Sequence, residues 1–102
     1  MKIKAGVQIA GIQPEMTLAL QIVEPILISY GQELVITSAT DSQHSKKSRH
    51  YIGYGLDLRS RDISEEARDS VAQEMSEALG SEYYVAFEVH HFHLQFNGSP
   101  RI

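Results

Sequence analysis

Residues 82–96 read EYYVAFEVHHFHLQF, and this aromatic and β-branched stretch decides the fold. As one unbroken strand, its fifteen residues would span about 50 Å. A domain of this length has a radius of gyration of about 13 Å and a diameter of only about 35 Å. The stretch must therefore bend or break, and because it contains no Gly or Pro, the sequence does not mark the place.

A first helix is predicted over about residues 14–30, where apolar residues recur at helical spacing. Pro14 opens it and Gly31 closes it. Pro25 is expected to kink or divide this helix, because proline removes an amide donor and clashes with the preceding turn.

A second helix is predicted over about residues 63–79, with apolar residues at intervals of four and Gly80 at its end. Asp62 and Glu65 have the Asp-x-x-Glu form of a capping box at its start. This is the clearest helix in the sequence.

Residues 34–37 and 54–58 are predicted strands, separated by an ordered polar loop over 38–49. The fold class that follows is α+β, with a small antiparallel sheet packed against the two helices in one domain of residues 1–102. We assign to its core the aromatic residues of the last stretch, Tyr83, Tyr84, Phe87, Phe92 and Phe96.

The composition limits the metal ligands and the partners that can be expected. The chain has no cysteine, so any metal must be held by histidine and carboxylate.

The apolar stretch after the basic N-terminus is interrupted by Gln8, Gln13, Pro14 and Glu15, so neither a signal peptide nor a membrane span is predicted. A net charge of −4 gives no reason to expect nucleic-acid binding. We expect a monomer with no membrane partner, made in the cytoplasm.

Positive charge is concentrated in one region. Five of the nine Lys and Arg residues lie between positions 46 and 61. This local cationic rim is suited to an anionic ligand, although charge alone favours a solvated loop. Its members are Lys46, Lys47, Arg49, Arg59 and Arg61.

The histidines are also concentrated. All five fall in two short segments, and Asp57 lies close to the first of them. His91 and His93, two apart on a strand, face the same side of a sheet. These residues have the composition of a zinc site, in which three protein ligands leave a fourth position for water. The five histidines are His44, His50, His90, His91 and His93.

Two motifs resemble the signatures of one enzyme group. Residues 48–57, SRHYIGYGLD, resemble the Ser-x-His-x-x-Gly-x-Ala-x-Asp signature of the LAS zinc peptidases, with Gly55 in place of the alanine. Residues 91–93, HFH, resemble the second signature, His-x-His. The resemblance spans about residues 13–96. The group includes D-alanyl-D-alanine carboxypeptidases, L-alanyl-D-glutamate endopeptidases of phage endolysins, and the structurally similar N-terminal domain of hedgehog proteins.

Residue by residue, the resemblance implies a zinc ion bound by His50, Asp57 and His93, with water in the open position. It implies hydrolysis of an amide bond in a peptidoglycan stem peptide. A proton shuttle is still needed, and Glu88 is the first candidate, with His90 as its competitor.

The remaining assignments concern residues around the metal. His44 matches an additional active-site histidine of some relatives, and we assign to it the stabilisation of the oxyanion. His91 is expected to support the metal ligands without binding the metal itself, or to contact the substrate. Ser48 and Arg49 are assigned to substrate binding, Ser48 alternatively to orienting His50.

In a regular strand, Glu88 and His90 point away from His91 and His93. A bulge or turn near residues 88–90, which the length argument requires, brings Glu88 to the metal side.

Two alternatives stay open. One is a non-catalytic binding module with a structural zinc site of the hedgehog type. The other is a metal-free domain that binds an anionic partner through the basic loop. As an enzyme, the chain requires a phage release route or a fusion partner to reach the cell wall, unless it acts on soluble fragments.

Overall fold

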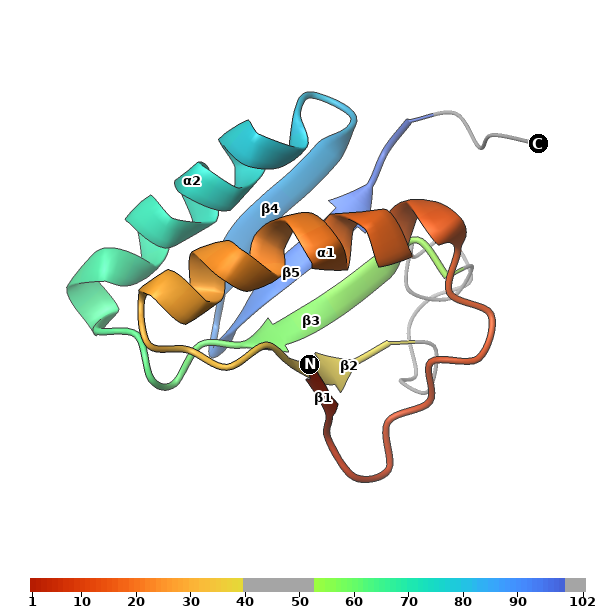
Figure 1. Cartoon of the computed structure of the whole chain (residues 1–102), viewed down its shortest axis with the longest axis horizontal. Coiled ribbons are helices and arrows are strands. Elements are labelled where there is room, and N and C mark those ends of the chain that lie inside the picture. The colour runs from red at the N-terminus through yellow and green to blue at the C-terminus, as the bar shows by residue number, and fades with distance from the viewer. Residues whose placement is uncertain (40–52, 99–102) are drawn as a thin grey trace.

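The computed structural model describes residues 1–39 and 53–98, which form one five-stranded sheet with two helices on one of its faces (Figure 1). In chain order the elements are β1 (Lys2–Ile3), α1 (Pro14–Ser29), β2 (Val35–Ser38), β3 (Gly55–Arg59), a 3₁₀ turn (Glu65–Ala67), α2 (Arg68–Leu79), β4 (Tyr83–Glu88) and β5 (His91–Phe96). The α+β class predicted from the sequence is confirmed. No helix in the described ranges has the length and apolar character needed to cross a membrane.

The strand order is β1-β2-β3-β5-β4. All neighbouring pairs are antiparallel except β1 and β2, which are parallel. The sheet is therefore mixed, whereas the sequence predicted an antiparallel sheet. The parallel pair was not predicted because the short strand β1 has no signal in the sequence. Parallel neighbours need a crossover connection, and α1 lies within the one that joins β1 to β2.

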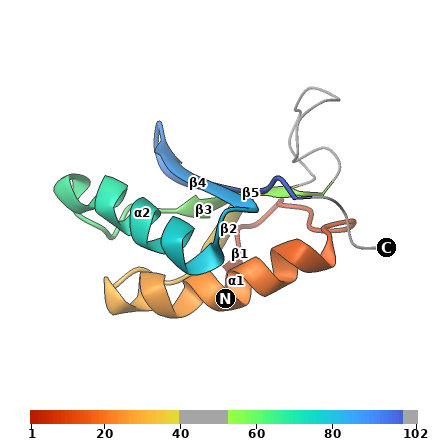
Figure 2. The same cartoon turned by 90° about the horizontal axis from the view of Figure 1, so that it is seen from above.

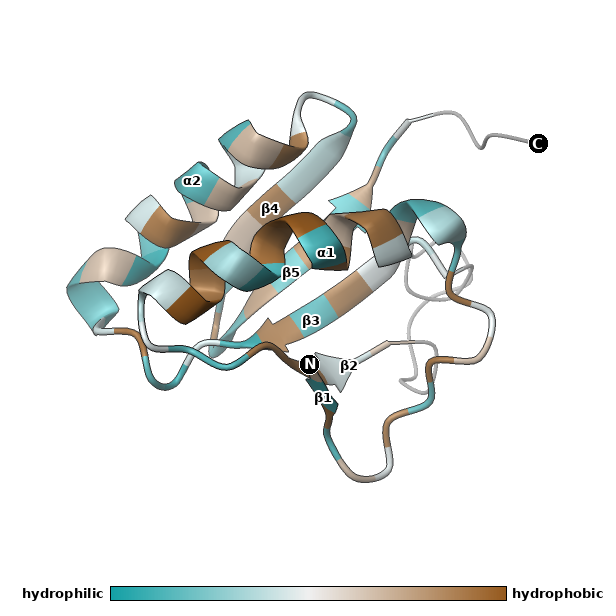
Figure 3. Cartoon of the chain, in the orientation of Figure 1, coloured by the Kyte–Doolittle hydropathy of each residue, from teal (hydrophilic) through white to brown (hydrophobic). Residues whose placement is uncertain are grey.

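Both helices pack on the same side of the sheet (Figure 2). Alternate residues of β5 follow this asymmetry: Phe92, Leu94 and Phe96 are buried, whereas His91 and His93 are partly exposed. We call the side of the sheet opposite the helices the open face. The same alternation of hydrophilic and hydrophobic residues can be followed along β3 in Figure 3.

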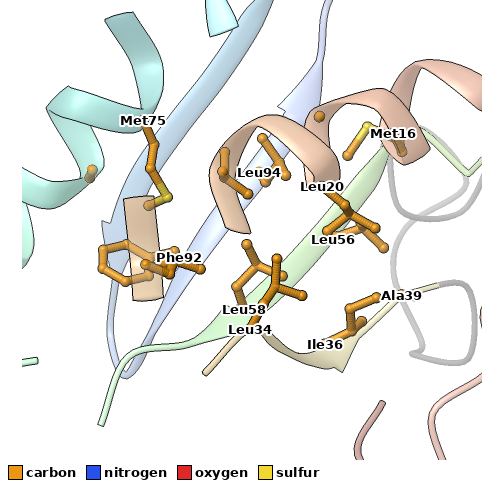
Figure 4. Packing of buried hydrophobic residues seen from close by; sticks show 14 of the residues in the cluster. Met16, Leu20, Leu34, Ile36, Ala39, Leu56, Leu58, Met75, Phe92 and Leu94 are labelled. Atoms are coloured by element: carbon orange, nitrogen blue, oxygen red, sulfur yellow. The ribbon is translucent and has the colours of Figure 1, made fainter. Parts of the chain in front are cut away.

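The core lies between the helices and the sheet (Figure 4). Burying each large apolar side chain contributes about 1.5–3 kcal/mol to stability. Phe92 and Phe96 belong to the core as expected, and Tyr83 and Phe87 pack against it. Tyr84 does not, because its 44% exposed side chain belongs to the opposite side of β4. The largest fully buried apolar side chains are Phe92, Phe96, Met16, Leu27, Leu34, Ile36, Leu56, Leu58, Met75 and Leu94.

Helix α1 is not divided at Pro25. Pro25 is exposed, whereas Val23 and Leu27 on either side of it are fully buried. Water can therefore hydrate the carbonyl that loses its amide partner, while the buried face of the helix keeps its packing.

The start of α2 differs from the capping-box prediction. The 3₁₀ turn comes first, with no side-chain cap at Ser64, and α2 begins at Arg68. A capping box needs Glu65 to accept the backbone N–H of Asp62. In the structure that N–H donates to Oε1 of Gln32 at 2.9 Å, and Gln32 is itself buried. The predicted end is confirmed, since Gly80 follows α2 with φ of 93°.

Gly53 anchors the start of β3 to the segment before α1. It has φ of +84°, and a Cβ built on it would lie 2.1 Å from the carbonyl oxygen of Gly11. The backbone N–H of Gln13 also donates to the Gly53 carbonyl at 3.0 Å. The backbones at Gly53 and Gly11 therefore approach each other too closely for a side chain at position 53.

We expect Gly53→Ala to lower the free energy of unfolding by about 3 kcal/mol, because it adds a backbone clash to an unfavourable φ. Gly31→Ala is the matched control: Gly31 also has positive φ, but a Cβ there meets nothing within 4 Å. This control should lose only about 1–2 kcal/mol. Equal losses in urea denaturation of the two variants would show that the contact with Gly11 is unimportant.

Strands β4 and β5 are joined by a two-residue turn at Val89 and His90, because Glu88 pairs directly with His91. The break that the length argument required is thus located. Val89 has φ of 56° and is 79% exposed. A β-branched residue is strained in this region, where hairpin turns favour glycine. The hydroxyl of Ser60 donates to the His90 carbonyl at 3.0 Å and ties the turn to the end of β3.

Val89→Gly should therefore stabilise the protein by about 1 kcal/mol, or about 4–8 °C in melting temperature. Val89→Ala removes most of the exposed side chain but keeps the Cβ, so it should gain less. If thermal denaturation gives the same gain for both variants, the strain at Val89 is not the cause.

Candidate functional site

The site is built around Asp57, in the middle of β3. Asp57 is directly opposite His93 of β5, so both side chains lie on the open face. His93 Nδ1 lies 3.1 Å from Asp57 Oδ1, and His91 Nε2 lies 3.3 Å from Asp57 Oδ2. Asp57 is buried. A buried carboxylate needs such partners, and here each of its oxygens has an imidazole nitrogen beside it.

His93 is held on both sides of its ring. Its Nε2 lies 2.8 Å from Oε1 of Gln95, whose Nε2 donates to Oδ1 of Asn97 at 2.6 Å. Gln95 therefore turns its oxygen, an acceptor, toward the ring. Since both ring nitrogens of His93 face acceptors, only the protonated imidazole donates to both.

The pKa of His93 is correspondingly raised above its ordinary value. The largest cause is the hydrogen bond with Asp57, and partial burial opposes it. The hydrogen bond to Gln95 and the negative charges of Asp57 and Glu88 also raise this pKa. In the absence of metal, the arrangement thus favours a proton between His93 and Asp57.

The same geometry fits a metal ion in place of that proton. Two ligand atoms about 2.0–2.1 Å from a tetrahedral zinc ion are about 3.3–3.4 Å apart. The Asp57–His93 and Asp57–His91 separations of 3.1 and 3.3 Å are close to this value. If Nδ1 of His93 held zinc, Nε2–H would remain available to donate to Gln95, as zinc-bound histidines commonly do to a second partner.

Within residues 1–39 and 53–98, no group of three His, Asp or Glu side chains is arranged to hold a metal ion. A zinc site of three protein ligands therefore needs a ligand from the rest of the chain. His50, the ligand predicted for that role, lies outside the described residues. His44, Ser48 and Arg49 lie outside them as well.

Glu88 lies on the open face as well. Partners on antiparallel strands share a face, and Glu88 is the partner of His91. A regular strand would have placed Glu88 on the opposite side from His91, so the two-residue turn makes the difference. His90 occupies the turn itself with an exposed side chain.

The register arranges the open face in rows across strands β3, β5 and β4. Asp57, His93 and Ala86 form the central row. Arg59, His91 and Glu88 form the row next to the turn. Gly55, Gln95 and Tyr84 form the row on the other side.

Sequence reasoning missed three members of this surface. Gln95 continues the two-residue spacing of His91 and His93, which was a usable signal. Arg59 is two positions beyond Asp57, but it was grouped only with the basic rim. Tyr84, whose ring centroid is 6.2 Å from that of His93, was assigned to the core.

Comparison with known proteins does not add a family. No protein-family model matches the chain, and searches of curated proteins and of solved structures found no significant similarity. The function is therefore inferred from the two motifs and from the geometry of the open face.

The raised pKa of His93 predicts a pH dependence of stability in the metal-free protein. A raised pKa means that protonation favours the folded state, so this contribution is fully present below the unfolded pKa of about 6.5. It is lost as the pH rises through the higher folded pKa. We expect urea denaturation in the presence of chelator to show a decline in stability from pH 6 to pH 8 that is larger in wild type than in His93→Gln.

The control is His90→Gln, which removes an exposed histidine from the turn and should keep the pH dependence of wild type. An unchanged pH dependence in His93→Gln would contradict the assignment.

Proposed function

We propose that this protein is a zinc-dependent hydrolase that cleaves an amide bond in peptidoglycan stem peptides. The observation that carries the proposal is the position of Asp57, next to His91 and His93 on the face of the sheet that the helices leave uncovered. The substrate class is implied by the resemblance of residues 48–57 and 91–93 to the two signatures of the LAS zinc peptidases.

The proposed zinc ligands are His50, Asp57 and His93. When bound, zinc would supply a Lewis acid that polarises the scissile carbonyl and lowers the pKa of a water molecule to about 7. Gln95 supports this role by holding the other nitrogen of the His93 ring. His91 supports it from the other oxygen of Asp57, where it fixes the orientation of the carboxylate.

Glu88 is the proposed proton shuttle. It belongs to the row next to that of Asp57 and His93, and its charge reaches His93, since it contributes to the raised pKa of that residue. Its side chain is exposed, so it can take a proton from water and return it to the leaving amine. His90 has the weaker claim, because it lies in the turn beyond the paired ends of the two strands. His44, Ser48 and Arg49 keep their proposed roles toward the oxyanion and the substrate.

The test measures zinc content and amine release from peptidoglycan for the same preparations. Wild type should hold one zinc ion per chain and release amines. His93→Gln should lose both properties. Glu88→Gln should keep zinc but release amines about a hundredfold more slowly, because general acid–base catalysis contributes on the order of 10²–10⁴ in rate.

Glu66→Gln makes the same charge change at an exposed site in the 3₁₀ turn and should match wild type in both measurements. A loss of activity in His90→Gln but not in Glu88→Gln would assign the proton shuttle to His90. Stoichiometric zinc without amine release would indicate the non-catalytic binding module instead. Absence of zinc from protein purified without chelator would refute the proposal.

A further inference from the structure

Strand β4 forms one edge of the sheet, and no strand in the described part of the chain pairs with its outer side. It is the last strand in the order β1-β2-β3-β5-β4, and all six of its residues pair with β5. Natural sheets commonly protect such an edge with lysine, proline or a bulge. β4 has none of these, since its sequence is YYVAFE and its register is continuous. The edge is therefore able to pair with a further strand.

The hydrogen bonds of the hairpin show which groups of β4 point outward. The Asn97 N–H donates to the Glu82 carbonyl at 2.7 Å, in line with the register of β4 and β5. Bonded pairs alternate along an antiparallel ladder, so every second residue after Glu82 bonds to β5 and the residues between them direct N–H and C=O outward. Val85 and Phe87 are two such residues. Their outward groups form no hydrogen bond with any other described residue.

Helix α2 lies beneath the space beside this edge. It packs against β4 and projects beyond it, on the side away from β5 (Figure 1). Val85 and Phe87 pack against the core on the helix side, but they are only half-buried. Their partners on β5, Leu94 and Phe92, are fully buried. An added strand would therefore cover apolar surface of Val85 and Phe87, while α2 would cover the helix side of that strand.

The side of α2 away from α1 carries small residues. Glu74 faces α1, because its carboxylate accepts the hydroxyl of Tyr30 at 2.7 Å. At about 100° per residue, Ala72 and Ser76 lie about 160–200° round the helix from Glu74. Small side chains at these two positions leave room for the side chains of an added strand.

A second copy of this chain does not fit the edge. Antiparallel pairing of two β4 strands about a two-fold axis would leave both α2 helices on the same side of the joined sheet. The paired strands would lie about 4.8 Å apart, whereas the axes of packed helices are about 8–10 Å apart. Because each α2 projects beyond its own β4, the two helices would overlap. A single extended segment meets no such obstacle.

We infer that the edge of β4 binds an extended peptide segment of another protein as an additional strand, at a site independent of the proposed zinc chemistry. The main-chain groups of Val85 and Phe87 supply the hydrogen bonds, and alternate apolar side chains of the peptide pack on α2. On the open face, Glu88 has an exposed side chain that forms no ion pair with another described residue. A lysine or arginine opposite Glu88 therefore matches its charge.

The probe is the peptide acetyl-Lys-Val-Thr-Val-Thr-amide, titrated into chelator-treated protein and followed by NMR. In antiparallel register its lysine lies opposite Glu88, and its two valines lie opposite Phe87 and Val85. Binding should shift the amide signals of Val85 and Phe87 and protect both amides from hydrogen exchange. Ile3 on the other edge strand should not respond, although its N–H also points outward, since those of Lys2 and Lys4 bond to the β2 side.

Modified peptides test the main-chain contacts without altering the protein. N-methylation of both valines removes the two donors that face β4 and should weaken binding about tenfold or more. N-methylation of both threonines is the matched control, because their N–H groups point away from β4. It should leave the affinity unchanged. Equal weakening by the two modifications, or no binding of the unmodified peptide, would overturn the inference.

A variant of the protein tests the same contact from the other side. Val85→Pro removes an outward N–H but no bond to β5, so the fold should persist while the peptide binds about tenfold more weakly. Ile3→Pro makes the same change on β1 and should bind the peptide as wild type does. Sedimentation of wild type should show no self-association through this edge. Dimers that Val85→Pro abolishes would make a second copy the occupant and contradict the inference.

Discussion

The two-residue turn at Val89 and His90 determines which side chains share the open face. With Glu88 paired to His91, Phe87 is directed to the helix side, where its ring centroid lies 5.8 Å from that of Phe92 and 5.3 Å from the Arg68 guanidinium carbon. A shift of one residue in register would reverse both positions, burying the carboxylate and exposing the aromatic ring. The packing of Phe87 against the core therefore also fixes Glu88 on the open face.

The one-sided burial of the sheet gives the site its rigidity. Leu56 and Leu58 on either side of Asp57 are almost completely buried under the helices. His93 is likewise flanked by Phe92 and Leu94, which are fully buried. Groups carried by strands are held more closely than groups carried by loops, so the core that stabilises the fold also aligns the carboxylate with the imidazoles.

Local patterns in the sequence were sufficient for most of the fold. Apolar spacing gave α1 and most of α2, and alternation in the last stretch predicted that His91 and His93 share a face. Interactions between distant residues were not predictable in this way. The start of α2 depends on Gln32, some thirty residues earlier, which takes the amide that Glu65 would have capped.

The candidate site was likewise only partly predictable from local patterns. The turn at Val89 has no glycine or proline, so no local signal fixed its position or brought Glu88 to the open face. Tyr84 was misassigned because aromatic character does not reveal which side of β4 is covered. The zinc ligand set remains a prediction, since His50 lies outside the described residues.

The strand order has a consequence for the order of folding. The β4–β5 hairpin closes over two residues, and such hairpins form in about 1–10 μs. Pairing of β3 with β5 must instead close a loop that runs from Arg59 to His91 and contains α2. We therefore expect Glu88 to meet His91 early, and Asp57 to meet His93 only once the sheet is complete. Zinc bound by the proposed ligands would then stabilise only molecules in which the sheet is complete, so metal binding would be coupled to the last step of folding.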